Sequence, residues 1–336
     1  MLSQSIPPLF VALLPVVAFL GGLVYFDSYK LVSLRRVLVI IMAGGLCCAG
    51  SYLLNGLARE NLGLTTPALS RYAAPVIEEL LKALIIIYFL SRNRIGFMVD
   101  AAIYGFAVGS GFAIIENLYY LQVYAGSNMA VWVVRGFGTA IMHGGVSAIF
   151  AVTAHSLSGT HDKIQPLALL PGLLLAILTH SVYNHFFLTP IFSTLLIIII
   201  LPVVAYTVVR QSEQQVSQWL GLSFDKDAEL LELINSGKFS NSNVGQYLHS
   251  LCEYFSGETV VDILCYLRLH KELSLRAKGM LMMRENGFEV EIEPDVHEVL
   301  AEMKALQENI GKTGQAAIKP FLRLSRKDLW QIYLLE

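Results

Sequence analysis

The sequence predicts an all-α, polytopic membrane protein with about seven transmembrane helices, an external N-terminus and a C-terminal helical cytoplasmic domain. Of its 336 residues, 55% are hydrophobic and only 15% are charged, and the mean hydropathy is +0.57. An ordinary soluble domain has about 25% charged residues, so this composition excludes a soluble enzyme of the same length. The net charge of −2 gives no reason to expect a nucleic-acid partner.

The charged residues are concentrated in the C-terminal part of the chain. Residues 1–209 contain 17 of them, and the remaining 127 residues contain 33. The first part has the composition of a lipid-embedded domain and the second part that of a soluble domain. We therefore expect a transmembrane domain over residues 1–210 and a helical cytoplasmic domain over residues 211–336.

A segment that crosses a bilayer needs about 20 mostly apolar residues. The expected spans are residues 8–26, 37–54, 76–90, 95–121, 129–155, 164–187 and 191–209. Basic residues concentrate in the loops after the first, third, fifth and seventh spans: Lys30, Arg35, Arg36, Arg92, Arg94, Lys163 and Arg210. Because basic loops stay on the cytoplasmic side, this alternation places the N-terminus outside the cell and residues 211–336 inside.

The C-terminal part shows helical periodicity, without a nucleotide-binding loop or a metal-binding cysteine pattern. Helices are expected over residues 225–235, 241–255, 258–285 and 295–310. A last helix is expected after a capping box at Ser325–Asp328. The size and position of this part suggest the hypothesis that it binds a cytoplasmic partner.

Several of the expected spans contain polar residues that are costly in a membrane. They are Glu78, Glu79, Lys82, Glu116, Arg135, His143, His180 and Asn184. One isolated charge at mid-membrane costs about 3 kcal/mol on insertion scales. These groups should therefore face one another or a wet cavity, and such residues are candidates for function.

The spacing of small residues indicates which way three of these helices face. Glu116 continues a stripe that includes Gly105 and Gly109, and His143 and His180 lie on similar stripes. Small residues let helices approach closely, so these side chains should point into the bundle, in the outer half of the membrane.

A structural interpretation of these residues also stays open. Lys82 lies four residues after Glu78, the spacing of a helical ion pair, and Arg135 is a candidate to neutralise Glu116. A single histidine on a small-residue face is more often a packing residue.

Two hydrolytic mechanisms fit these groups. In the first, a buried glutamate takes a proton from water, and His180 and Asn184, four residues apart on one helical face, stabilise the oxyanion. In the second, Zn²⁺ is held by some of Glu116, His143 and His180, and Glu78 or Glu79 is the base. The sequence lacks the His-Glu-x-x-His motif of many zinc proteases, and it leaves both mechanisms open.

Four segments resemble the motifs of the PrsW family of intramembrane proteases, which belongs to a wider group that includes CAAX prenyl proteases and bacteriocin-processing proteins. Residues 75–82 resemble its EExxK motif and residues 111–119 its FxxxEN motif. Arg135 with His143 resembles the third motif, and residues 180–184 resemble the fourth, HxxxN. Glu116 stands where CAAX relatives usually have histidine, which favours the PrsW branch.

The resemblance implies a multi-pass peptidase of the bacterial cytoplasmic membrane, commonly classed as a metallopeptidase. Its implied substrate is a membrane protein such as an anti-sigma factor, cut on its extracytoplasmic side. Glu78, Glu79, Glu116, His143, His180 and Asn184 are then the expected catalytic residues. A proton- or cation-coupled transporter is the alternative, since buried Glu, Lys and His chains also form proton relays. A non-catalytic membrane scaffold is a third hypothesis.

Overall fold

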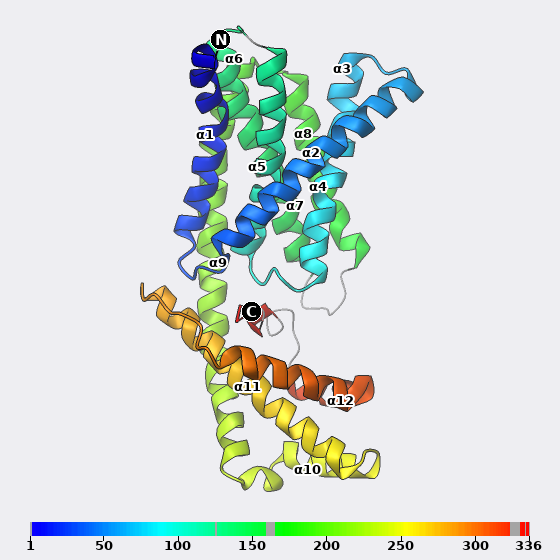
Figure 1. Ribbon diagram of the computed structural model, residues 1–336, viewed down its shortest axis with the longest axis vertical. Helices are drawn as coiled ribbons and strands as arrows, with labels where there is room; N and C mark the ends of the chain where they lie inside the picture. The colour runs from blue at the N-terminus through cyan, green and yellow to red at the C-terminus, as the bar shows by residue number, and fades with distance from the viewer. Residues whose placement is uncertain (1, 125, 159–164, 323–329, 333, 336) are drawn as a thin grey trace. The chain divides into compact units, whose positions relative to one another are not determined.

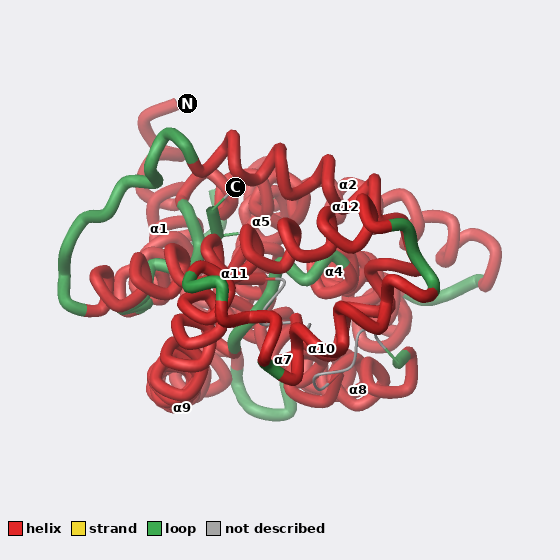
Figure 2. The backbone as a smooth tube through the Cα atoms, turned by 90° about the horizontal axis from the view of Figure 1, so that it is seen from below, coloured by secondary structure: helices red, strands yellow, loops and turns green. Residues whose placement is uncertain are grey.

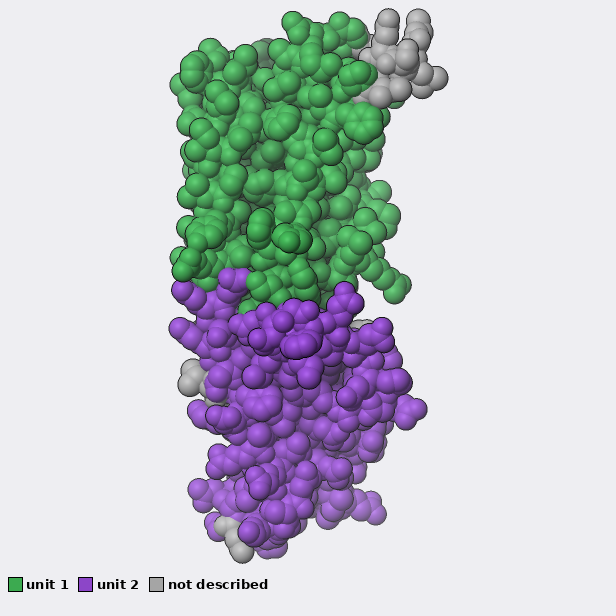
Figure 3. Space-filling model, turned by 90° about the vertical axis from the view of Figure 1, so that its left-hand side faces the viewer, with its two compact units in different colours: residues 1–212 green, residues 213–336 purple. Residues whose placement is uncertain are grey.

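The structure, a computed structural model, describes the chain except for residues 1, 125, 159–164, 323–329, 333 and 336. Every regular element in the described residues is a helix (Figures 1 and 2), which confirms the predicted all-α fold. The chain divides into two compact units, Met1–Ser212 and Glu213–Glu336 (Figure 3). Lys163 and the capping box at residues 325–328 lie outside the described residues.

The first unit is a bundle of helices linked by short loops. Its elements are α1 (Leu2–Phe26), α2 (Leu34–Leu62), α3 (Thr66–Ala68), η1 (Leu69–Ala73), α4 (Ala74–Ser91), α5 (Met98–Val123), α6 (Met129–Val133), η2 (Val134–Ala140), α7 (Ile141–Ser158), α8 (Pro166–His185) and the start of α9 (Pro190–Asn235). The segments η1 and η2 are π-helical turns that run directly into α4 and α7. Each of the two π-turns thus precedes a helix that carries predicted site residues.

Within the part of the chain that the structure describes, six helical segments are long and apolar enough to cross a membrane. They are Pro7–Phe26, Leu34–Leu62, Met98–Val123, Met129–Ser158, Pro166–His185 and the helix Pro190–Asn235. Large apolar side chains such as Leu178 and Ile199 are about 60% exposed, as expected of a surface that contacts lipid. The chain is thus a multi-pass membrane protein. The third predicted span lies in α4, which has three charged residues and is not among the six, so the count of seven and the orientation stay predictions.

Helix α5 lies at the centre of the first unit and contacts α1, α2, α4 and α7. Gly105 and Gly109, one turn apart, face α7. A side-chain carbon on Gly109 would overlap the backbone carbonyl of His143, and one on Gly105 would overlap that of Ser147. The predicted small-residue stripe is therefore confirmed: it brings α5 against α7 at the level of His143.

We expect Gly109→Ala to destabilise the protein although alanine favours a helix over glycine by about 1 kcal/mol. The added methyl must displace the backbone of α7, and overpacking of this kind costs about 1–3 kcal/mol. The measurement is the thermal midpoint of the purified protein in detergent. Gly56→Ala on α2 is the matched control, since nothing lies within 4 Å of its added carbon. Equal midpoints for the two variants would contradict the close approach of α5 and α7.

The second unit contains the end of α9, η3 (Lys238–Asn241), α10 (Asn243–Ser250), η4 (Leu251–Glu253), α11 (Gly257–Glu285) and α12 (Val296–Leu322). Asp227 on α9 is fixed to α11 by Lys271 (2.7 Å), Ser274 (2.6 Å) and Lys278. This network is internal to the unit. With both lysines at most 5% exposed at the side chain, it links the two helices by a buried ionic cluster.

Some of the helices expected in residues 211–336 are confirmed and others are not. The prediction for residues 258–285 is confirmed by α11. Of the expected helix 295–310, residues 296–310 lie in α12, which bends at Gly311 (φ 63°). The segment 225–235 is not a separate helix, because nothing after Pro202 interrupts α9 before Asn235. The single helix expected over residues 241–255 is wrong: α10 ends at Ser250 and a tighter turn follows it.

Candidate active site

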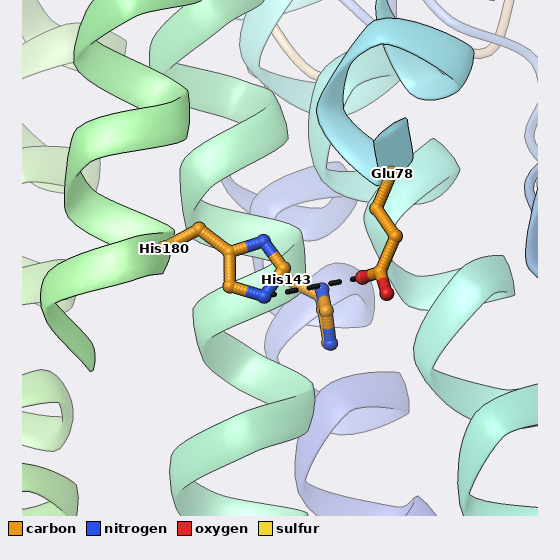
Figure 4. Close-up of side chains that lie close together, drawn as sticks. All are labelled: Glu78, His143 and His180. Carbon is orange, nitrogen blue, oxygen red and sulfur yellow. Dashed lines mark ion pairs between the residues drawn. The ribbon is translucent and has the colours of Figure 1, made fainter. Parts of the chain in front are cut away.

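Five of the six predicted site residues come together between α4, α5, α7 and α8. We call this set the carboxylate–imidazole cluster: Glu78, Glu79, Glu116, His143 and His180. Figure 4 shows three of its members, with the side chains of Glu78 and His180 directed toward each other and His143 beside them. Both imidazoles are at most 2% exposed. The requirement that these polar groups face one another in the membrane is met.

Glu79 is neutralised within α4 and also holds a histidine of α8. Its Oε1 lies 2.5 Å from Lys82 Nζ and 2.7 Å from His180 Nδ1. Because a carboxylate can only accept a hydrogen bond, His180 donates its Nδ1 proton to Glu79. The other nitrogen, Nε2, which carries no proton when the ring is neutral, faces Glu78 Oε2 at 3.9 Å. The sequence placed Lys82 opposite Glu78 as the four-residue pair, but the ion pair forms with Glu79.

Glu116 has its own cation on the π-turn before α7. Its Oε2 lies 3.0 Å from a guanidinium nitrogen of Arg135, and Arg135 Nε donates to Asn117 Oδ1 at 2.8 Å. The guanidinium also lies 3.9 Å from the ring centre of Tyr120. The expectation that Arg135 neutralises Glu116 is therefore confirmed. A group fixed by three neighbours holds this carboxylate in one place.

His143 lies between the two ion pairs. Its Nδ1 is 3.2 Å from Lys82 Nζ, and its Nε2 is 3.3 Å from Glu116 Oε2. The ammonium can only donate, so Nδ1 accepts and the proton of the neutral ring sits on Nε2, toward Glu116. The rings of His143 and His180 meet edge to face, with centres 4.8 Å apart. His143 thus connects the α4 pair to the α5 carboxylate.

Asn184, the sixth predicted residue, points elsewhere. Pro75 has no N–H, which leaves the carbonyls of Arg71 and Ser70, four and five residues before it, without a donor from that position of the helix. Asn184 Nδ2 donates to the Ser70 carbonyl at 2.9 Å, and Ser181 Oγ donates to the Arg71 carbonyl at 2.6 Å. In this structure Asn184 therefore fastens α8 to η1, and its predicted role as oxyanion donor stays a prediction.

Glu78 differs from the other two carboxylates of the cluster. Across the described part of the chain, no Lys or Arg forms an ion pair with it. Its Oε1 accepts a hydrogen bond from Asn55 Nδ2 of α2 at 3.2 Å. The sequence analysis did not identify Asn55, which directly follows the apolar run 37–54. The feature that could have indicated it is a side-chain amide at the end of an expected span.

The cluster contains more carboxyl groups than cations. Among the described residues, Lys82 pairs with Glu79 and Arg135 pairs with Glu116, and Glu78 is the carboxyl group without a Lys or Arg partner. One ligand atom from each of Glu78, His143 and His180 lies within 4.8 Å of the others. A buried, uncompensated carboxylate beside two imidazoles is the donor set that a divalent transition metal takes.

A family model described as PrsW family intramembrane metalloprotease matches residues 33–208, just over half of the chain. The chain belongs to this family. The match spans all four motif segments, the whole cluster and Asn55. Comparisons with curated proteins and with solved structures found no match. As a PrsW-family member the protein is a membrane-embedded peptidase, and nothing observed favours the transporter.

Membership in the PrsW family also implies a metal cofactor. The residues present fit one, because Glu78, His143 and His180 offer carboxylate and imidazole ligands within reach of one another. Glu79 already holds His180 through Nδ1, as an outer carboxylate does for a histidine that binds metal through its other nitrogen. Glu116, which the sequence suggested as the carboxylate ligand, is instead occupied by Arg135.

Proposed function

We propose that this protein is a zinc-dependent intramembrane endopeptidase in which Glu78, His143 and His180 hold the metal. The observation that carries the proposal is the grouping of these three side chains around a carboxylate that has no cation of its own. When bound, Zn²⁺ supplies Lewis acidity, which makes water nucleophilic near neutral pH. His143 offers a ring nitrogen by giving up its contact with Lys82 or Glu116.

The remaining residues have roles that follow from their contacts. Glu79 fixes the tautomer of His180, and Lys82 keeps Glu79 ionised. Glu116 is the most exposed carboxylate of the cluster, with 21% of its side chain accessible against 11% for Glu78 and 2% for Glu79. We assign to Glu116 the proton of the attacking water, and to Arg135 the task of holding that carboxylate.

The substrate is proposed to be a membrane protein. Water must reach a site that is buried among helices, and a transmembrane or membrane-adjacent peptide can approach it from the lipid side. The resemblance to PrsW extends the proposal to a membrane-spanning protein such as an anti-sigma factor, cut in the outer half of the bilayer. A cytoplasmic partner for the second unit stays a hypothesis.

The test is cleavage of a panel of single-span membrane proteins by the purified full chain in detergent. His180→Ala should lower cleavage at least about 100-fold, because it removes an imidazole of the site. Glu79→Gln should lower cleavage about 10- to 100-fold, because it removes the carboxylate that holds this imidazole. His185→Ala on the same helix is the matched control: its Nδ1 bonds to the Ser181 carbonyl, outside the cluster. Equal loss in the control, or wild-type cleavage by both site variants, would reject the proposed site.

A further inference from the structure

One polar side chain reaches the cluster from outside the four motif segments. Asn55 lies on α2, 23 residues before Glu78, and its Nδ2 donates to Glu78 Oε1 at 3.2 Å. Helix α2 otherwise meets α4 and α5 through mostly apolar and small residues. This hydrogen bond is therefore a polar link between α2 and a residue of the candidate metal site.

The orientation of the amide follows from its neighbour. In the structure Asn55 Nδ2 donates to Glu78 Oε1, so the nitrogen of the amide faces Glu78 and its Oδ1 faces away. Oδ1 is buried, and in the described part of the chain it has no hydrogen-bond partner. Burying an unpaired carbonyl is unfavourable, because the group loses its hydrogen bonds to water. A leucine of similar size would avoid that cost, so packing alone does not account for an asparagine here.

The hydrogen bond from Asn55 orients the side chain of Glu78, which has no cation to hold it among the described residues. Glu79 and Glu116 are each held by a cation, whereas Glu78 has Asn55 on Oε1 and His180 Nε2 at 3.9 Å from Oε2. With Oε1 engaged by Asn55, Oε2 is directed toward the two imidazoles. Groups that orient a metal ligand in this way change metal affinity about 10–100-fold when they are removed.

We propose that Asn55 is a positioning residue that holds Glu78 in the orientation needed to bind the metal. This inference rests on the proposed function, because it takes Glu78 as a ligand. It adds to the site a residue of α2, which no motif of the resemblance includes. Asn55 acts through Glu78 and contacts neither the metal nor the reacting atoms.

The experiment measures Zn²⁺ affinity of the full chain in detergent by competition with a chromophoric chelator, so no substrate is needed. Asn55→Leu, which removes the donor at nearly constant volume, should bind Zn²⁺ about 10–100-fold more weakly than wild type. Asn61→Leu is the matched control, since Asn61 lies on the same helix and donates only to the Leu57 carbonyl at 2.8 Å. The control should bind as wild type does.

Two further variants separate the possible failures. His180→Ala should lose Zn²⁺ binding; if it binds as wild type does, or if wild type binds none, the proposed metal site itself is wrong. If His180→Ala loses binding while Asn55→Leu stays within about twofold of wild type, only the role of Asn55 is overturned. Asn55→Ala also removes the amide donor, and the thermal midpoint without metal shows which of the two Asn55 variants is folded. A folded Asn55 variant whose Zn²⁺ affinity is unchanged refutes the proposal.

Discussion

Glu78→Gln is expected to abolish both Zn²⁺ binding and cleavage. Glutamine is neutral, whereas Glu78 is the carboxyl group of the cluster that no Lys or Arg of the described residues pairs with. An amide is also a far weaker metal ligand than a carboxylate. Cleavage of a single-span membrane substrate should fall at least about 1,000-fold, since removing a group essential to the hydrolytic step has effects of this order. The change is nearly isosteric, so the bundle should stay folded.

The informative partner of this variant is Glu116→Gln. It should lower cleavage about 100- to 10,000-fold, the range for a general base, while Zn²⁺ affinity changes far less. Both variants are measured in the same two assays, chelator competition and substrate cleavage. If Glu116→Gln loses the metal and Glu78→Gln retains it, the ligand set is Glu116, His143 and His180, and Glu78 is the base.

Removal of the metal should have an equally large effect on the wild-type protein. Treatment with a strong chelator is expected to reduce cleavage to the background of the Glu78→Gln variant, because three side chains alone do not replace the Lewis acid. Addition of Zn²⁺ in excess of the chelator should restore cleavage. The measurement is product formation before chelation, after it and after add-back.

The chelator experiment needs a control for damage to the protein. The thermal midpoint before and after chelation shows whether the helices remain folded, and Mg²⁺ add-back tests for a non-specific ionic effect, since Mg²⁺ favours all-oxygen octahedral sites. Cleavage that persists at the wild-type rate after verified metal removal would contradict the zinc mechanism. It would favour the alternative in which a glutamate alone activates water.

Much of the fold and of the cluster follows from the sequence. Long apolar segments predict membrane helices because the bilayer fixes their length. The high cost of isolated charges in lipid predicts that Glu79, Glu116, His143 and His180 meet. The glycines of α5 predict its close approach to α7, since only small residues allow it. Each of these conclusions depends on local composition or on the general cost of charge in lipid. None of them requires the exact path of the chain.

The details of the site depend on helix rotation and crossing. Lys82 pairs with Glu79 and not with Glu78, and the same Glu79 oxygen also meets His180 of α8. Asn184 turns to Ser70 because Pro75 leaves backbone carbonyls open in the turn before α4. A π-turn adds a residue to the helical repeat and shifts every later side chain around the axis. Helical spacing alone therefore does not predict how Arg135, which lies in the π-turn η2, faces relative to His143 in the following helix.

The amino-acid sequence is sufficient to predict an all-α membrane protein and most of the polar residues that meet inside it. The three-dimensional arrangement shows that ligand atoms of Glu78, His143 and His180 lie within 4.8 Å of one another, that Glu116 is paired with Arg135, and that Asn55 of α2 reaches Glu78. The physical reason is that burial penalties act on residue types, whereas partner choice depends on distances of a few ångströms between helices that are far apart in sequence.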